Sequence, residues 1–311
     1  MITPPYLKKG DKIGIVAPSG KIVKEKFLPA LDIFKSWGVE IVLGENLFNT
    51  HHTYAGTDEQ RLSDFQKMLD DDSIKAIICA RGGYGMVRII DKMDFTNFVR
   101  NPKWITGFSD ITVLHNHIHK NFLTETIHGI MPLSFPKSAA AVEFLRKALF
   151  GEKLNYDLTP DPSPKERGTC ENRSGVAEGT IVGGNLAIIY SLSGTNSDIN
   201  TDGKILFIED LNEYLYNIDR MILNLKRTGK LKNLAGLIVG GMSDMKDNEI
   251  PFGKTAEEII WDAVKECDYP VCFGFPAGHI DENYALILGR NAKLIVEKNK
   301  TCLDFSEKNI V

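Results

Sequence analysis

Apolar and polar positions in the first half of the chain follow two alternating spacings. Four short apolar runs predict strands that begin at Lys12, Val39, Ile74 and Trp104. Between them, apolar residues at helical spacing predict helices over 24–37 and 57–69. The second helix has Thr57 or Asp58 as its expected N-cap. Because strands that are apolar throughout are typical of sheets covered on both faces, this half predicts an open parallel α/β sheet.

This alternation stops between about residues 158 and 175. The segment there, TPDPSPKERGTCENRSG, contains three prolines and several charged side chains but few apolar ones. Such a composition supplies little material for a packed core. We therefore predict a first α/β domain over 1–157, a linker or insertion over 158–175, and a second domain over 176–311.

The second domain has strands and helices in a less regular order. Apolar runs predict buried strands in KILFIED and LAGLIVGGMSD, and shorter strands in ALILGRNAKLIVE. Helices are predicted over 217–228 and 255–267, because each stretch presents one apolar face. These faces consist of Ile218, Met221, Ile222 and Leu225 in the first helix and Ile259, Ile260 and Val264 in the second. The pattern predicts a second α/β domain whose sheet mixes strand directions.

Charge and composition narrow the range of functions. The 311 residues carry 37 Lys and Arg against 41 Asp and Glu, which gives a net charge of -4. Without a basic excess to neutralise phosphates, a nucleic-acid partner is not expected. No apolar run approaches the roughly 20 residues of a membrane-spanning helix, and the N-terminus lacks a secretory pattern. We therefore expect a cytoplasmic protein without a membrane partner. Its five cysteines form no CxxC pair, so neither disulfides nor structural zinc are expected.

The first candidate for chemistry is the loop RGGYG, which follows the strand beginning at Ile74. Gly82, Gly83 and Gly85 permit unusual backbone angles and let main-chain N–H groups face a ligand. The loop fits half of an oxyanion hole, a phosphate cradle, or simply a tight turn into a helix. The phosphate interpretation is the weakest of the three, because neither of the common phosphate-loop glycine patterns is present.

The second candidate is Ser109 in GFSD, at the end of the strand that begins at Trp104. A serine at a strand-to-helix turn exposes its hydroxyl, and nearby N–H groups can stabilise an oxyanion. The hydrolase pattern G-x-S-x-G is incomplete, because Ile111 stands in place of its second glycine. From this local pattern alone, helix capping by Ser109 or Asp110 is the simpler interpretation.

The third candidate group lies in the second domain. Glu209 ends a buried strand, Glu213 follows shortly after, and His279 lies in the loop FPAGHIDE. A histidine in such a loop can act as a general base whose tautomer is fixed by a carboxylate. Taken singly, each residue is better explained without catalysis, Glu209 as a solvated strand end or a partner for Arg220 and His279 as a surface loop histidine. Together with Ser109 they suggest a serine–histidine–carboxylate set, in which Glu209 and Glu213 compete for the acidic place.

A metal site at His115 and His119 is one interpretation, because the two residues share one face of the helix expected after Ser109. Two histidines at this spacing can ligate zinc, but no HExxH pattern accompanies them. A partly exposed helix face is the favoured interpretation. The sequence therefore predicts neither a metal nor another cofactor.

Several segments occur in one order from near the N-terminus to near the C-terminus: KKGDKIGIVAPSG, ARGGYGMVRIID, ITGFSDITVL, TIHGIMP, GTIVGGNLAII, ILFIEDLNEYLYNID and GFPAGHIDENYALILGRNAKL. Each is weakly specific alone, but the ordered set resembles the LD-carboxypeptidase family. That family includes muramoyltetrapeptide carboxypeptidases and the related microcin C immunity peptidases. The resemblance covers nearly the whole chain.

Carried over to the matching positions, the resemblance implies a role for each candidate residue. Ser109 is the implied nucleophile, Glu209 the acid that orients the histidine, and His279 the general base. The implied oxyanion hole uses backbone N–H groups of Asp110 and Gly83. The implied architecture is a flavodoxin-like N-terminal domain, similar to class I glutamine amidotransferases, followed by a smaller β-rich domain of the swivelling type. The nucleophile then belongs to one domain and the other two residues to the second, in a homodimer.

The implied activity is serine-type hydrolysis of the L,D-peptide bond that releases terminal D-Ala from murein tetrapeptides. Arg81, from its charge and position, and Tyr84 are candidate substrate-binding residues. Two alternatives remain open. One is a sibling peptidase that cleaves a peptide-nucleotide antibiotic of the microcin C type. The other is a non-catalytic ligand-binding module that uses a two-domain cleft.

Overall fold

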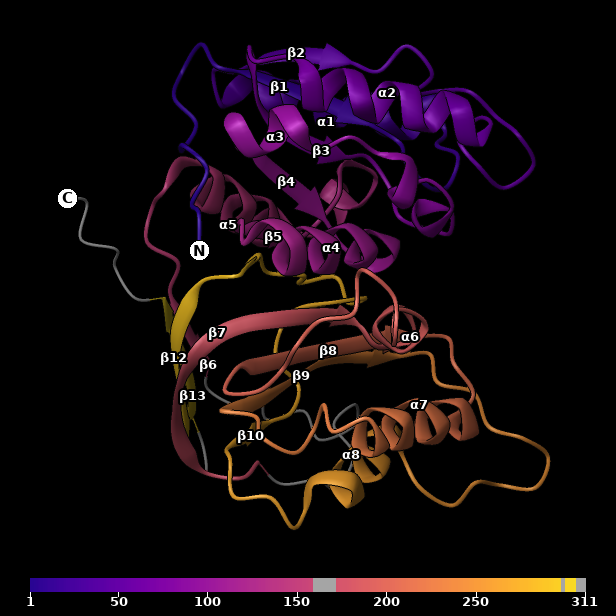
Figure 1. The fold of residues 1–311 in the computed structure, drawn as a ribbon, viewed down its shortest axis with the longest axis vertical. Coiled ribbons are helices and arrows are strands. Elements are labelled where there is room, and N and C mark those ends of the chain that lie inside the picture. The colour runs from indigo at the N-terminus through magenta and orange to yellow at the C-terminus, as the bar shows by residue number, and fades with distance from the viewer. Residues whose placement is uncertain (159–171, 298–299, 306–311) are drawn as a thin grey trace. The chain divides into compact units, whose positions relative to one another are not determined.

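The computed structural model describes residues 1–158, 172–297 and 300–305 of the chain (Figure 1). It contains two sheets, one of six strands and one of seven, each covered by helices. This is the mixed α/β class predicted from the sequence.

The chain divides into two compact units. Unit 1 comprises Met1–Lys153 together with Asp281–Leu288, and unit 2 comprises Leu154–Ile280 together with Gly289–Val311. The sequence placed Asp281–Leu288 in the second domain. The structure assigns it to unit 1, because its short strand β11 pairs with β5 of that unit. Most of the predicted linker at 158–175 lies outside the described residues.

Unit 1 is built on six strands. They are β1 (Lys12–Val16), β2 (Glu40–Leu43), β3 (Ile74–Cys79), β4 (Trp104–Gly107), β5 (Thr126–His128) and β11 (Leu286–Leu288). Its helices are α1 (Lys24–Ser36), α2 (Asp58–Asp70), α3 (Thr96–Arg100), α4 (Thr112–Phe122) and α5 (Ala139–Phe150). Its 3-10 turns are η1 (Met86–Arg88), η2 (Ile90–Lys92), η3 (Ser109–Ile111) and η4 (Pro132–Lys137).

The sheet of unit 1 has the strand order β11-β5-β4-β3-β1-β2. All its pairings are parallel except that of β11 with β5. Ile13, Ile77 and Ile105 in the central strands are fully buried, as expected for strands covered on both faces. The predicted open parallel sheet is confirmed, and its order places the loops after β1, β3 and β4 at one edge.

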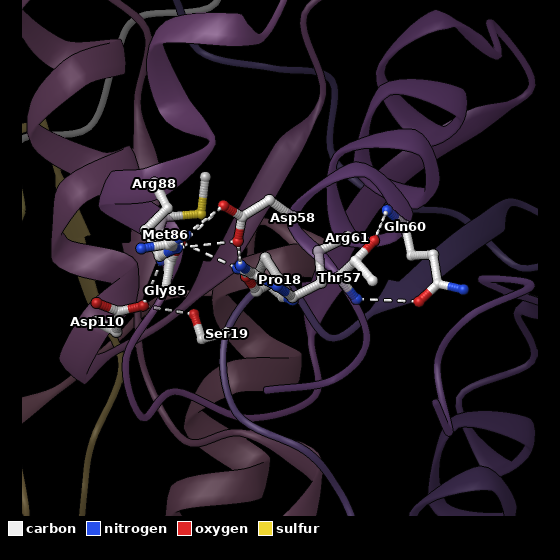
Figure 2. Close-up of polar contacts among 10 residues, drawn as sticks. All are labelled: Pro18, Ser19, Thr57, Asp58, Gln60, Arg61, Gly85, Met86, Arg88 and Asp110. Carbon is white, nitrogen blue, oxygen red and sulfur yellow. Dashed lines mark hydrogen bonds and ion pairs between the residues drawn. The ribbon is translucent and has the colours of Figure 1, made fainter. Parts of the chain in front are cut away.

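The start of α2 shows how local sequence fixes a helix in unit 1. The Thr57 hydroxyl accepts a hydrogen bond from the Gln60 backbone N–H, and the Gln60 side chain accepts one from the Thr57 N–H (Figure 2). This reciprocal pair is a capping box, which satisfies two N–H groups that the helix itself leaves unpaired. Of the two N-cap candidates, Thr57 holds the position.

Unit 2 contains the remaining strands and helices. Its strands are β6 (Tyr156–Leu158), β7 (Gly175–Asn185), β8 (Ile205–Leu211), β9 (Gly236–Ser243), β10 (Val271–Cys272), β12 (Asn291–Glu297) and β13 (Lys300–Phe305). Its helices are α6 (Leu186–Ser191), α7 (Leu215–Arg227) and α8 (Ala256–Val264).

The sheet of unit 2 has the order β10-β9-β8-β7-β12-β13-β6. The first four strands pair in parallel and the last four in antiparallel fashion, so the predicted mixture of strand directions is confirmed. Strands β7, β8 and β9 share one apolar core with α6, α7 and α8. The apolar faces predicted for α7 and α8 are buried in that core, which fixes the ends of β8 and β9.

Candidate active site

Ser109 lies at a sharp turn between β4 and α4. Its φ is 64°, in the left-handed region that residues with a side chain rarely adopt. Such a conformation costs on the order of 1–3 kcal/mol and persists where its surroundings enforce it. The flanking residues Phe108 and Asp110 are buried, whereas Ser109 is only partly so. The turn therefore presents one hydroxyl at the carboxyl end of the sheet. The capping role that the local pattern favoured for Ser109 or Asp110 is wrong, because the N-caps of η3 and α4 are Phe108 and Ile111 and neither makes a side-chain cap hydrogen bond.

The glycine loop Arg81–Gly85 lies directly against Ser109. A Cβ atom at Gly82 would stand 2.9 Å from the Ser109 Cβ and 3.2 Å from its Oγ. Gly83 and Gly85 have φ values of 112° and 142°, which only glycine adopts readily. Two of the predicted candidate loops thus meet within unit 1, and their backbones approach more closely than a larger residue would allow.

The two candidate substrate-binding residues belong to the same loop. The Arg81 guanidinium is exposed and donates a hydrogen bond to the Lys21 carbonyl at 2.6 Å. Tyr84 is 52% exposed, and its ring lies 6.2 Å from that of Tyr54. Both side chains are therefore exposed, and they belong to the loop whose Gly82 lies against Ser109.

In unit 2, Glu209 and His279 form a close pair. The His279 Nδ1 lies 2.6 Å from the Glu209 Oε2, which also accepts the His279 backbone N–H at 3.0 Å. The Glu209 side chain is fully buried and that of His279 is 14% exposed. A carboxylate in this position accepts a hydrogen bond from the Nδ1–H and leaves Nε2 as the basic nitrogen of a neutral ring.

The loop that carries His279 is shaped around this pair. Gly278 has a φ of 107°, and a Cβ there would lie 2.6 Å from the Glu209 Cβ and 2.7 Å from its Oε2. The Gly241 N–H donates to the Ala277 carbonyl at 2.9 Å, and the Ser243 hydroxyl donates to the His279 carbonyl at 2.8 Å. Both hydrogen bonds fix the loop to β9. Because Gly278 has no side chain, the loop can pass close to Glu209, and His279 then contacts the carboxylate.

The competing acid Glu213 lies elsewhere. Its side chain accepts a hydrogen bond from Asn217 at 2.9 Å, and its backbone carbonyl accepts one from the Lys246 N–H. Of the two carboxylates left open by the sequence, Glu209 is therefore the one that contacts His279.

Asp210, the neighbour of Glu209, points to a different partner. Its carboxylate accepts hydrogen bonds from the Asn185 side chain and from the backbone N–H groups of Ala187 and Leu211. Burial, and then the adjacent Glu209 charge, raises the pKa of Asp210 to about 6. This second buried carboxylate holds the start of α6 against the end of β8.

The sequence predicted that His115 and His119 lie on a partly exposed face of α4, and this prediction is wrong. His115 and His119 are 1% and 7% exposed, because this side of the helix packs inward. The His115 Nε2 lies 2.9 Å from the Gly107 carbonyl, and burial lowers the pKa of His115 to about 4. Across the described ranges, no group of three His, Cys, Asp or Glu side chains is arranged to hold a metal ion.

None of the described helices is both long enough and apolar enough to cross a bilayer.

Family models match most of the chain. Residues 13–129 match the LD-carboxypeptidase N-terminal domain, and residues 178–294 match the LD-carboxypeptidase C-terminal domain. The two matched domains carry, respectively, the Ser109 turn and the Glu209–His279 pair. The chain is a peptidase by class, and it belongs to the LD-carboxypeptidase family.

Curated relatives agree with this assignment. A protein of Bacillus subtilis (strain 168) named probable murein peptide carboxypeptidase is 37% identical over 294 residues, which cover 94% of this chain and 91% of the relative. The murein tetrapeptide carboxypeptidase of Pseudomonas aeruginosa is 27% identical over 292 residues, which cover 91% of this chain and 92% of the relative.

Solved structures share the fold. The muramoyltetrapeptide carboxypeptidase of Oxalobacter formigenes matches with a TM-score of 0.82 at 26% identity, over 95% of this chain and 99% of that one. MccF in complex with glutamyl sulfamoyl guanosine matches with a TM-score of 0.87 at 21% identity, over 99% of each chain. The likeness to MccF shows the fold alone.

Sequence reasoning missed three buried polar residues near the candidate groups: Ser19, Arg61 and Asn185. Ser19 comes shortly after β1 and Asn185 ends β7. A polar residue at the end of an apolar strand is a signal that could have identified both. Arg61 lies inside α2, where an arginine is an ordinary helix residue. Its burial follows only from the packing of that helix.

Proposed function

We propose that this protein is a serine-type carboxypeptidase that hydrolyses the L,D-peptide bond of murein tetrapeptides and releases terminal D-Ala. The observation that carries the proposal is the Glu209–His279 pair, with Nδ1 and Oε2 2.6 Å apart. A buried carboxylate on one ring nitrogen is the arrangement that makes the other nitrogen a general base. The names of the relatives support murein peptides as the substrate class.

In this proposal the nucleophile is Ser109. The His279 Nε2 removes the Ser109 proton as Oγ attacks the scissile carbonyl carbon, and Glu209 stabilises the imidazolium that forms. The tetrahedral intermediate collapses as the carbon–nitrogen bond breaks and His279 protonates the departing amine of D-Ala. Water, activated by the same imidazole, then hydrolyses the acyl-enzyme. The left-handed turn at Ser109 supports this role because it presents the hydroxyl with nearby N–H groups.

The remaining assignments concern binding. Backbone N–H groups of Asp110 and Gly83 are the proposed oxyanion donors, and the positive φ of Gly83 supports a role for this loop. Arg81 and Tyr84 are the proposed substrate contacts, with the Arg81 guanidinium offering hydrogen-bond donors to the free carboxylate. The reaction uses no metal in this proposal. A homodimer, implied by the family resemblance, and the cytoplasmic location expected from the sequence complete it.

The test is Ser109→Ala, assayed for D-Ala release from a murein tetrapeptide. Removal of the nucleophile is expected to lower kcat by roughly 10⁴ to 10⁶. The thermal unfolding midpoint should stay nearly unchanged, because Ala keeps the Cβ of Ser109. Retention of more than a few per cent of wild-type activity would remove Ser109 from the nucleophile role. Comparing D-Ala release from the tetrapeptide with cleavage of an aminoacyl-nucleotide analogue separates the murein activity from the microcin C type of activity.

A further inference from the structure

The Ser109 turn and the glycine loop come from different connections of unit 1, yet the proposed reaction needs them in fixed register. A displacement of about 1 Å between reacting groups can cost on the order of 10²-fold in rate. Oxyanion donors act at about 2.7–3.1 Å from the developing charge. Buried side chains that join these loops are therefore candidates for holding the loops in place, a role that the proposed mechanism does not assign to any residue.

Asp110 is the first such side chain (Figure 2). Its Oδ2 accepts the Ser19 hydroxyl at 2.6 Å and the Met86 backbone N–H at 2.7 Å. Ser19 lies in the loop after β1, and Met86 directly follows the glycine loop. Asp110 is 1% exposed and Ser19 fully buried. One carboxylate oxygen thus joins the three loops that follow β1, β3 and β4.

Arg61 of α2 joins two of the same loops (Figure 2). Its Nη1 donates to the Pro18 carbonyl at 2.5 Å and to the Gly85 carbonyl at 3.0 Å. Its Nη2 pairs with Asp58. The guanidinium also lies 5.0 Å from the centre of the Tyr54 ring. The residue is 1% exposed, so its contacts with the Pro18 and Gly85 carbonyls form away from water.

The backbone contacts point the same way. The Gly20 N–H donates to the Gly82 carbonyl at 3.0 Å, which closes the loop after β1 onto the glycine loop. A buried charge stabilises a fold no better than well-packed apolar groups do, and its best-attested use is to specify one arrangement. Asp110 and Arg61 are two buried charged residues that both form hydrogen bonds to these loops. Their burial therefore indicates that they fix the positions of the loops.

We propose that Asp110 and Arg61 are positioning residues, which hold the glycine loop at a fixed place relative to the Ser109 hydroxyl. The inference rests on the proposed function, in which this loop supplies an oxyanion donor. Asp110 also follows Ser109 directly, so its two hydrogen bonds hold the strained turn in the left-handed conformation. Without that support the turn relaxes, and both the nucleophile and the Asp110 N–H move.

The first experiment compares Asp110→Ala with Asp110→Asn by steady-state kinetics and by the rate of Ser109 labelling with a fluorophosphonate. Asp110→Ala removes the acceptor and should lower kcat and the labelling rate about 100-fold, with KM changed less than about 3-fold. Asp110→Asn keeps an oxygen at the Oδ2 position and should stay within about 10-fold of wild type. Arg61→Lys should lower kcat about 10-fold, because one ammonium cannot replace the guanidinium fork.

The matched control is Asp64→Ala. Asp64 is another buried carboxylate of unit 1, and it accepts two hydrogen bonds from Asn46 at 2.8 Å each. Its removal should lower stability without changing kcat per folded molecule. Equal kcat values in folded Asp110→Ala, Asp64→Ala and wild type would overturn the inference.

A second variant keeps the test decisive if Asp110→Ala fails to fold. Ser19→Ala removes one donor to Asp110 and should lower kcat about 5-fold to 10-fold. An unchanged kcat in Ser19→Ala would then overturn the inference. Wild-type protein that is labelled at Ser109 but releases no D-Ala would refute the substrate, and the labelling rates alone would decide the positioning role. Wild-type protein without labelling would refute both proposals.

Discussion

The Ser109 turn in unit 1 and the Glu209–His279 pair in unit 2 position their groups by different means. Ser109 is placed by its backbone, through a φ of 64° that the surrounding loops enforce. His279 is placed by a side-chain contact of 2.6 Å and by a glycine that lets its loop touch Glu209. Ser109 therefore depends on the loops around it, whereas His279 depends on one carboxylate and one glycine.

The largest effect that sharpens this comparison is expected at Glu209. Glu209→Gln keeps an oxygen for the His279 hydrogen bonds but removes the negative charge that, in the proposed mechanism, stabilises the imidazolium. We expect kcat to fall roughly 10²-fold to 10⁴-fold, as seen when the acid of such a set is made neutral. Steady-state assay of D-Ala release measures this loss.

Glu213→Gln serves as the matched control for that variant. Its side chain bonds Asn217 and makes no contact with His279, so kcat should stay within about 2-fold of wild type. A larger loss in Glu213→Gln than in Glu209→Gln would exchange the two roles.

An intermediate effect is expected from Gly278→Ala. The added Cβ would meet Glu209 at 2.6 Å in a backbone conformation that alanine avoids. We expect a loss of roughly 2 kcal/mol or more in the free energy of unfolding, and a fall of about 10-fold to 100-fold in kcat. Chemical denaturation and steady-state kinetics together measure both.

Gly229→Ala separates the collision from the backbone strain. Gly229 also has a positive φ, of 82°, but a Cβ there meets nothing within 4 Å. This variant should lose about 1 kcal/mol and keep full activity. Equal losses of activity in the two glycine variants would show that close packing on Glu209 does not place His279.

The smallest effect concerns pH and Asp210. The folded pKa of Asp210, about 6, lies above its ordinary value of 3.8, because burial and the Glu209 charge disfavour ionisation. The folded protein therefore binds this proton more tightly, and the contribution to stability is lost as the pH rises from about 4 to about 6.

Asp210→Asn should remove this part of the pH dependence. Relative to the variant, the wild-type free energy of unfolding should fall between pH 4 and pH 7, as measured by urea denaturation at each pH. Parallel profiles for the two proteins would contradict the shifted pKa of Asp210.

Much of the fold could be predicted because its strands are apolar throughout and its helices have one apolar face. The sheet of unit 1, the cap at Thr57 and the buried faces of α7 and α8 all followed from such local patterns. The exposure of His115 and His119 was predicted wrongly, since spacing shows which residues share a face but not what covers that face. A short strand was predicted where β11 lies, but its place in unit 1 was missed, because sequence order does not show which sheet a short strand joins.

The candidate site was predictable in its residues but not in its contacts. Glu209 and Glu213 lie four positions apart near one strand end, so sequence spacing alone could not choose between them. In the structure His279 contacts Glu209 and not Glu213, because the positive φ of Gly278 lets the loop pass close to Glu209. Arg61 escaped prediction because its contacts join loops that are far apart in the sequence.

The central claim is the proposal that Ser109 and His279 act together in catalysis, although Ser109 belongs to unit 1 and His279 to unit 2. The most direct test measures kcat for Ser109→Ala, for His279→Ala and for the double variant. Groups that act together are strongly non-additive, so the double variant should be about as active as either single variant. Losses that multiply in the double variant would contradict the account.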